Sequence, residues 1–175
     1  IFEPASETWT QGASYPRPEG RIAQGAAVFD GKIYLFGGIN VFGTYATNTV
    51  DVYDPEKDLW TLDVSRCPKL MHSMACITVG GRILMFGGSP YQCSAGVYSS
   101  VYAYDPARNH WQQLADIPEG RWAATAVCPE AEYGDLTDAG KGTVVYLVGG
   151  IGPDCKARDT VYRYHVSDNT WQLAG

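Results

Sequence analysis

The sequence predicts an all-β protein built from a repeated unit of four short antiparallel strands, the blade of a β-propeller. In three stretches an apolar run ends in a glycine doublet and a segment bearing Tyr and Trp follows. These stretches are residues 32–60, 82–111 and 143–171. Tryptophans recur at intervals of 51, 51 and 60 residues, at Trp9, Trp60, Trp111 and Trp171. Self-similarity at a period of this size is the mark of a repeat architecture.

Each repeat contains four short strand signals. The first is small and apolar and leads into a turn, Asp30-Gly31 or Gly80-Gly81, of the kind that closes two-residue hairpins. The second is a continuous apolar run, typical of strands covered on both faces. The third has an alternating pattern of residues, and the fourth carries the tryptophan. We predict first strands at 25–29, 75–79 and 123–127, second strands at 33–36, 83–86 and 144–148, and third strands at 50–53, 101–104 and 161–164.

The residue types favour a radial arrangement of these sheets, the β-propeller, over a flat sandwich. First strands rich in Ala, Gly and Cys fit the crowded axis, and the Tyr–Trp pair fills the widening space between outer strands. A glycine doublet after each buried strand lets a neighbouring backbone approach where a Cβ would block it. A solenoid is the competing architecture, but its repeats are usually shorter or helical, and this sequence shows no helical period.

The doublet, the tyrosine and the tryptophan together resemble the kelch repeat. The tyrosine follows the second glycine by 15, 16 and 14 residues in the three repeats, and the tryptophan follows the tyrosine by 7 in each, as in Gly38, Tyr53 and Trp60. The resemblance covers three repeats and a leading fragment. Two departures stand out: His165 occupies a position where the repeat has Asp, and the acidic segment 129–142 replaces a tight hairpin.

The phase of the repeat indicates how much of a ring the chain supplies. We expect an outer strand and connection at 1–20, blades at 21–63, 71–115 and 121–175, and an insertion in the last blade at 129–142. Both ends are fourth strands, Thr8–Gln11 and Thr170–Leu173, and about four to eight blades close a propeller. We therefore expect part of a six- or seven-bladed ring. The alternative is a half-propeller that a second copy completes as a homodimer.

Composition and charge narrow the classes of partner. The chain of 175 residues carries 13 Lys and Arg against 19 Asp and Glu, for a net charge of −6. Nucleic acid is not an expected partner, because binding its backbone needs clustered basic residues. No apolar run reaches the ~18 residues of a membrane span, so a membrane is not expected either. We expect a protein partner and no cofactor.

The five cysteines fit no CxxC spacing, so no zinc site is expected. Cys76 and Cys128 lie in apolar strand patterns and are predicted to be core residues. Cys93 and Cys155 each follow a doublet by five residues and could face each other, although free thiols in a reducing compartment, the cytoplasm, are favoured. Cys67 lies in a connection between repeats, which makes it the thiol expected to be most reactive.

Alternating strand directions place the second-to-third loops and the connections between blades on one face. These segments carry arginines and tyrosines, the residue types that are frequent at interface hot spots. The candidate partner-binding residues are Arg21, Asn40, Tyr45, Arg66, His72, Tyr91, Tyr98 and Arg121. Arg17 and Arg158 lie on the same face, and we expect them to be exposed to solvent.

Kelch propellers commonly bind protein segments on this face, often acidic ones held by arginines, so the resemblance implies such a role for Arg21 and Arg121. Guanidinium groups would hold partner carboxylates in bidentate pairs, and tyrosine rings would add flat contact area. The equally weighted alternative is that these two arginines bond neighbouring blades and fix the loops. The middle repeat has Met71 or His72 at the equivalent position.

An enzymatic alternative would use the same face. Some kelch-like propellers are enzymes, among them the N-acetylneuraminate epimerase, whose sugar-acid substrate would need an arginine and a nearby acid or base. Arg21 or Arg121, with Glu19 or Glu119, fit those roles, although the repeated PEGR string accounts for all four without catalysis. The three histidines, His72, His110 and His165, do not form a metal site. We therefore favour a binding module with no metal and no catalytic residues.

Overall fold

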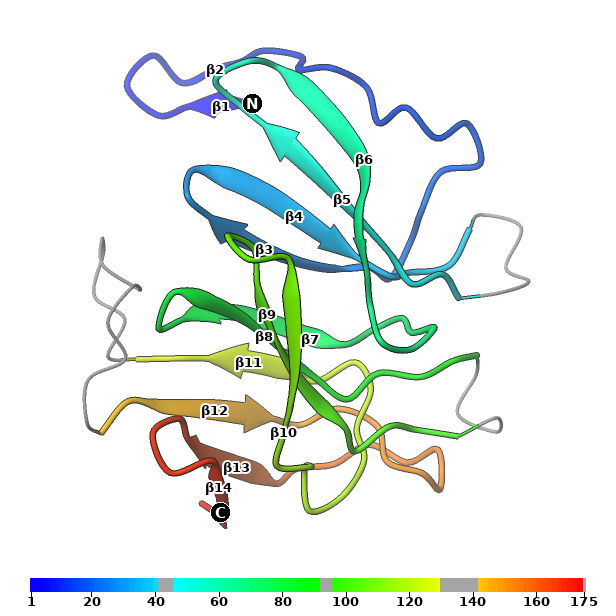
Figure 1. The fold of residues 1–175 in the computed structure, drawn as a ribbon, viewed down its shortest axis with the longest axis vertical. Coiled ribbons are helices and arrows are strands. Elements are labelled where there is room, and N and C mark those ends of the chain that lie inside the picture. Colours follow the sequence, from blue (N-terminus) through cyan, green and yellow to red (C-terminus); the bar gives the residue numbers. More distant parts are fainter. Residues whose placement is uncertain (41–45, 92–95, 130–141, 175) are drawn as a thin grey trace.

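The computed structural model describes residues 1–40, 46–91, 96–129 and 142–174. In these ranges the regular elements are all strands, which form three four-stranded antiparallel sheets and one two-stranded ribbon (Figure 1). The ribbon pairs β1 (Phe2–Glu3) with β2 (Thr8–Trp9). The sheets contain, in order, β3 (Gly25–Phe29), β4 (Lys32–Phe36), β5 (Thr49–Asp54) and β6 (Leu59–Arg66); β7 (Ala75–Val79), β8 (Arg82–Phe86), β9 (Val101–Asp105) and β10 (His110–Leu114); and β11 (Thr125–Val127), β12 (Val144–Val148), β13 (Val161–His165) and β14 (Thr170–Leu173). The predicted all-β fold of four-stranded blades is confirmed.

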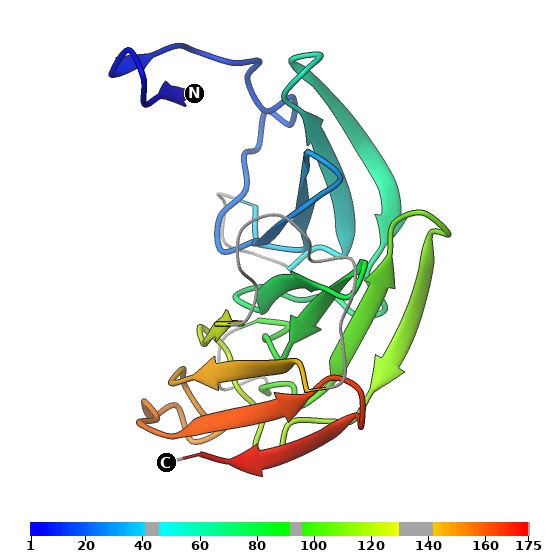
Figure 2. The ribbon, with the colours of Figure 1, turned by 90° about the vertical axis from the view of Figure 1, so that its left-hand side faces the viewer.

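The three sheets follow one another like the blades of a fan (Figure 2). Their first strands lie against one another, β3 against β7 and β7 against β11. Small side chains permit this approach: a Cβ at Gly25 would collide with the side chains of Cys76 and Met74. The small, apolar first strands are therefore the ones that bring neighbouring blades together.

Two-residue turns close the first hairpins of the first two blades, as the sequence predicts. Phe29 pairs with Lys32 around Asp30 and Gly31, which both have positive φ, at 49° and 68°. Two successive left-handed residues match the twist of the flanking strands. The third blade differs from the prediction, since β11 begins at Thr125 instead of residue 123. Ala123 has a φ of 54°, a left-handed conformation that cannot continue a strand.

The middle blade is buried on both of its faces. From β8, Ile83 and Met85 pack toward the first blade, whereas Leu84 and Phe86 pack toward the third. Alternate residues of a strand point to opposite faces, so two separate cores require an apolar residue at every position. This explains why the second strands read as unbroken apolar runs.

The glycine doublets allow the connection to the next blade to lie directly on the sheet edge. The amide of Gly88 donates a hydrogen bond to the carbonyl oxygen of Arg121 at 2.7 Å, and Gly38 does the same to Met71 at 2.8 Å. A Cβ at Gly87 would overlap the carbonyl oxygen of Arg121, and its φ of 65° also favours glycine. The predicted role of the doublets, close backbone approach, is what the structure shows.

Each repeat tryptophan fastens its blade to the chain of the blade before it. The ring of Trp171 lies against that of Tyr164, tilted by 41° with ring centroids 4.9 Å apart, and its indole Nε1 donates to the carbonyl of Ala115 at 2.9 Å. Asn169 completes the link, because its Oδ1 accepts from the Tyr164 hydroxyl and from the Ala115 amide. In the first blade, Trp60 Nε1 donates to the carbonyl of Ala13 at 3.0 Å. We call this arrangement the tryptophan latch.

The cysteines correct two of the sequence-based expectations. Cys67 is buried in the core between the first two blades, and burial raises the pKa of its thiol to about 12, so it is not an exposed reactive group. Cys155 is disulfide-bonded, which contradicts the favoured expectation of a free thiol. Cys93 lies outside the described residues. Cys76 packs against the core between the first two blades, as predicted.

Candidate functional site on the loop face

The loops that follow the glycine doublets meet the connections between blades along one edge of the molecule, which we call the loop face. Short antiparallel bridges join the two kinds of segment. These bridges pair Ile22 with Ile39, His72 with Ser89, and Trp122 with Ile151. The described residues of the loop face are 13–22, 38–40, 46–49, 66–72, 88–91, 96–100, 115–122 and 149–160.

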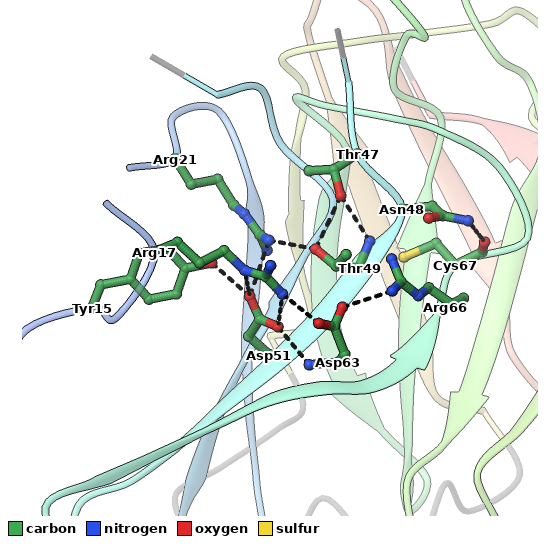
Figure 3. Close-up of polar contacts among 10 residues, drawn as sticks. All are labelled: Tyr15, Arg17, Arg21, Thr47, Asn48, Thr49, Asp51, Asp63, Arg66 and Cys67. Carbon is green, nitrogen blue, oxygen red and sulfur yellow. Dashed lines mark hydrogen bonds and ion pairs between the residues drawn. The ribbon is translucent and has the colours of Figure 1, made fainter. Parts of the chain in front are cut away.

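Asp51 of β5 is the centre of a charged network at the loop face (Figure 3). Its buried carboxylate accepts hydrogen bonds from Arg17 Nε at 3.0 Å, Arg17 Nη2 at 2.9 Å and the Tyr15 hydroxyl at 2.5 Å. Arg21 Nη2 lies 3.0 Å from the same carboxylate, and the amide of Asp63 donates to it at 2.8 Å. The incoming connection is thereby tied to the first blade.

The network shifts the proton affinity of its members. Burial works against ionisation of Asp51, but hydrogen bonds from Arg17, Tyr15 and the Asp63 amide outweigh it and lower the pKa of Asp51 to about 2. Burial, together with the hydrogen bond to Asp51, raises the pKa of Tyr15 to about 12. Asp51 is therefore ionised and Tyr15 protonated at neutral pH.

The sequence led us to expect that Arg17 and Arg158 are exposed to solvent, but in the structure both form ion pairs. Arg17 joins Asp51 to Asp63, with Nη2 3.0 Å from Asp63 Oδ2. Arg158 makes a double contact with Glu119, with Nε at 3.1 Å and Nη2 at 2.7 Å from Oε1. Both are drawn from solvent because each faces a carboxylate from a segment distant in the sequence.

Arg21 and Arg121 occupy equivalent places and make equivalent bonds. Arg21 Nη2 donates to Thr49 Oγ1 and Arg121 Nη2 donates to Thr160 Oγ1, both threonines lying at the point where a third strand begins. Arg121 also donates to the carbonyl of Gly149 at 2.8 Å and lies 3.2 Å from Glu119. The two side chains are 4% and 1% exposed. This geometry favours the structural interpretation of both arginines.

In the middle blade a lysine, Lys69, takes the place of the arginine at the start of the third strand. Met71 stands at the position of the arginines and is buried in the core between the first two blades. Lys69, two residues earlier, donates to the hydroxyl of Ser100 at 3.3 Å and lies over the ring of Tyr98 at 4.5 Å. A basic group therefore reaches the start of the third strand in every blade.

A small pocket opens beside Arg21 on the loop face. Its volume is about 220 Å³. The lining residues, which we call the loop pocket, are Arg17, Glu19, Gly20, Arg21, Asn40, Ala46 and Thr47. Two buried polar atoms of the lining residues, Arg21 Nη1 and Asn40 Oδ1, have no hydrogen-bond partner within the described residues. Buried polar atoms of this kind are normally satisfied, and because both have less than 1 Å² of accessible surface a ligand in the pocket would not reach them.

The remaining candidates divide into buried and exposed groups. His72 is buried, accepts or donates at Ser73 through Nδ1, and contacts the carbonyl of Tyr91 through Nε2. Tyr98 is half-buried, and burial raises its pKa. The side chains open to a partner are Tyr91, at 43% exposure, and Arg66, at 58%. Tyr45 lies outside the described residues.

Several residues of this site were missed by sequence reasoning, chiefly Asp51, Thr49, Tyr15 and Thr160. One signal was available for Asp51. It stands in the alternating third strand where the other two repeats have Tyr102 and Tyr162, and a carboxylate at an inward position needs a buried partner. The bonds to Arg17 and Arg21 supply it.

Metal and membrane sites find no support in the part of the chain that the structure describes. No group of three or more His, Cys, Asp and Glu side chains in these ranges could hold a metal ion. Within the same ranges there is no helix with the length and apolar character needed to cross a membrane.

The four-stranded blades, the doublets and the tryptophan latch define a segment of a β-propeller. Kelch motif models match residues 20–62 and 70–118. The chain belongs to the kelch-repeat family. The sequence-based resemblance is thus confirmed.

Relatives are found among kelch-like proteins and one scruin. Kelch-like protein 23 of Homo sapiens is 29% identical over 99% of this chain and 28% of its own length. Kelch-like protein terF of Aspergillus terreus is 31% identical over 95% of this chain and 35% of its own length. Alpha-scruin of Limulus polyphemus is 30% identical over 73% of this chain and 14% of its own length. The chain thus spans about a third or less of these relatives, and their names give the epimerase alternative no support.

Proposed function

We propose that this chain is a protein-interaction module that binds a segment of a partner protein on its loop face. Kelch repeats typically mediate protein–protein interactions, and the chain contains at least two matched motifs of this family. The residues proposed to contact the partner are the exposed Tyr91 and Arg66 together with the loop pocket.

One observation carries the choice of this face. On the loop face, Tyr91 and Arg66 are 43% and 58% exposed and combine an aromatic ring with a basic group. Tyr91 would contribute flat contact area at low conformational cost, as aromatic residues do at interfaces.

The acidic-segment version of this hypothesis is weakened by the charges already present. Asp51 and Glu119 occupy the guanidinium groups that were expected to hold partner carboxylates. Arg66 is the more exposed basic group, although Asp63 lies 3.0 Å from it. An acidic segment remains the competing outcome of the experiment below.

Selection of peptides from a random library, followed by mapping on variants, tests the proposal. Selected peptides should bind Asn40→Ala and Tyr91→Ala at least tenfold more weakly than the unchanged chain, with the melting temperature preserved. Lys57→Ala and Glu56→Gln, on turns of the opposite face, are matched controls that should leave binding unchanged. Loss of binding in the controls alone would place the partner elsewhere and overturn the proposal.

A further inference from the structure

We propose that the chain has a second binding site, a pocket between the first two blades that takes a small ligand with an aromatic ring and a carboxylate group. The pocket has a volume of about 310 Å³ and lies at the end of the blades opposite the loop face, beside the β5–β6 and β9–β10 turns. We call it the turn pocket. Its volume falls within the ~300–1,000 Å³ typical of small-molecule sites. Because it is separate from the loop face, the inference goes beyond the proposed function.

One part of the turn pocket is aromatic and aliphatic. The rings of Tyr34 and Tyr104 line it and meet edge to face, with ring centroids 6.3 Å apart and an angle of 62° between their planes. The aliphatic lining residues are Val52, Leu59, Val64 and Pro106. Leu59 is 56% exposed, so a ligand that covers it removes apolar surface from water. An aromatic ring fits beside the two tyrosines, because ring pairs gain energy in edge-to-face and offset arrangements beyond the burial of area.

The polar part of the turn pocket carries one positive charge in excess. Its charged lining residues are Lys32, Asp54 and Lys57. The Asp54 carboxylate lies 3.4 Å from the Lys57 ammonium and accepts hydrogen bonds from the amides of Glu56 and Lys57. Lys32 is partly buried, and its ammonium makes no hydrogen bond or ion pair among the described residues. That ammonium is accessible, since it is not among the buried polar atoms that lack a partner. A ligand carboxylate would therefore pair with Lys32.

Tyr34 adds a neutral hydrogen-bond donor near Lys32. Residues 32 and 34 lie on the same face of β4, because alternate residues of a strand point to the same side. The Tyr34 hydroxyl makes no hydrogen bond among the described residues, and it too is absent from the buried atoms without a partner, so it is accessible. Burial, together with Tyr104 and Asp30, raises the pKa of Tyr34, so the hydroxyl stays protonated at pH 7. The unused groups are thus donors, and an ionised carboxylate, which only accepts, matches them.

The second blade shows how the repeat can close the equivalent space. Arg82 and Gln112 stand at the positions that Lys32 and Thr61 occupy in the first blade. Arg82 Nη1 donates to Gln112 Oε1 at 2.9 Å, a bond that joins β8 to β10 over β9. Lys32 and Thr61 have shorter side chains and make no such bond within the described residues. The turn pocket is open because of this pair of residues and not because of the blade geometry.

Two matched probes test the inference: 3-phenylpropanoate and 3-phenylpropanamide, titrated into the ¹⁵N-labelled chain at pH 7. They share the ring and differ in the charge of the terminal group. The carboxylate probe should shift the backbone amide signals of Lys57, Leu59 and Asn109, and it should bind at least fivefold more tightly than the carboxamide probe. Hexanoate, which has the charge but no ring, should bind at least threefold more weakly than 3-phenylpropanoate. Equal binding of hexanoate would overturn the role of the ring.

Substitution of Lys32 isolates the charge argument. Lys32→Met should lower the affinity for 3-phenylpropanoate at least fivefold and leave the affinity for 3-phenylpropanamide unchanged. Lys156→Met, which removes one positive charge from the loop face, should leave both affinities unchanged. An equal loss in the two variants would show that net charge sets the preference, and the assignment of Lys32 would fail.

A double variant tests the pocket itself. Lys32→Arg combined with Thr61→Gln copies the pair in the second blade and keeps the charge, so what it removes is the open space. It should abolish the response to 3-phenylpropanoate while the melting temperature is preserved. Undiminished binding in this variant, equal affinity for the two ring probes, or a failure of both to shift the signals would each overturn the inference. None of these results bears on the proposed function, which the library peptides test on the loop face.

Discussion

Arg121 donates a hydrogen bond to Thr160 at 2.6 Å from a side chain that is almost wholly buried. The same guanidinium bonds the carbonyl of Gly149 and contacts Glu119. This one guanidinium group therefore holds together the start of β13, the end of β12 and the connection that leads into the third blade. The arginine acts as a structural tie that the repeat reuses at Arg21.

Replacing Arg121 should lower stability markedly. Arg121→Met is the informative change, because the middle blade carries Met71 at the equivalent position and a side chain of this size fits there. The hydroxyl of Thr160 and the carbonyl of Gly149 would lose a partner, at a cost of about 2–3 kcal/mol in the free energy of unfolding measured with urea. Arg66→Met, at a mostly exposed arginine, should change it by less than about 0.5 kcal/mol. Equal losses would show that burial of Arg121 is not important.

The glycine doublet can be tested against a glycine of nearly identical backbone conformation. Gly87 and Gly31 have φ values of 65° and 68°, but a Cβ at Gly31 meets nothing within 4 Å, whereas one at Gly87 overlaps the carbonyl oxygen of Arg121. Gly31→Ala should therefore cost about 1 kcal/mol, the penalty of a left-handed conformation. Gly87→Ala should cost about 2–3 kcal/mol more, since the next blade must move. Comparable melting temperatures for the two variants would contradict the close-approach explanation.

The ionised state of Asp51 should make the first blade sensitive to acid. Its pKa is about 2 in the folded chain against a usual value of 3.8, so the unfolded state takes up the proton first as the pH falls. The stability that ionised Asp51 contributes is thus complete above about pH 4 and is lost toward pH 2. Urea unfolding at pH 2 to 6 should show this decline, and Asp51→Asn should differ from the unchanged chain most at pH 6 and least at pH 2.

A matched carboxylate controls for general acid effects. Asp30→Asn, in the exposed turn between β3 and β4, should reproduce the pH curve of the unchanged chain. A curve for Asp51→Asn with the same pH dependence as the unchanged chain would show that another group is responsible.

Cys67 should resist alkylation in the folded chain. Burial raises the pKa of its thiol to about 12, so almost no thiolate is present at pH 8. Iodoacetamide treatment followed by mass spectrometry should find Cys67 unmodified in buffer and modified in urea. Modification in buffer at the rate of an exposed cysteine would show that the connection around Cys67 opens readily.

The blades could be predicted because the signals that specify them are local and repeated. The Asp30-Gly31 turn fixes the register of its hairpin, and the run around Ile83 reports burial on both faces. The start of β11 was predicted two residues too early, since the left-handed conformation of Ala123 is unusual for alanine. Ala23 and Ser73 share this conformation in the other repeats, so it belongs to the connection and not to the residue type.

The site was less predictable than the fold, because its bonds join distant segments. Arg17 looked like an exposed loop residue, yet the carboxylate that binds it comes from Asp51, 34 residues away. Cys67 lies in a connection, where exposure is the usual expectation, but that connection crosses the core between two blades. In both cases the deciding contact comes from a segment distant in the sequence: the first blade itself for Arg17, and the packing of two blades for Cys67.

The tryptophan latch also sets an order in time. The carbonyl of Ala115 receives its bond from Trp171, which follows it by 56 residues. At synthesis rates of about 5–20 residues per second, that tryptophan leaves the ribosome roughly 3–11 s after the segment it secures. The segment that follows the outer strand of a newly synthesised blade therefore lacks this hydrogen bond until the next blade is complete. A chaperone that binds exposed outer strands would act during this interval.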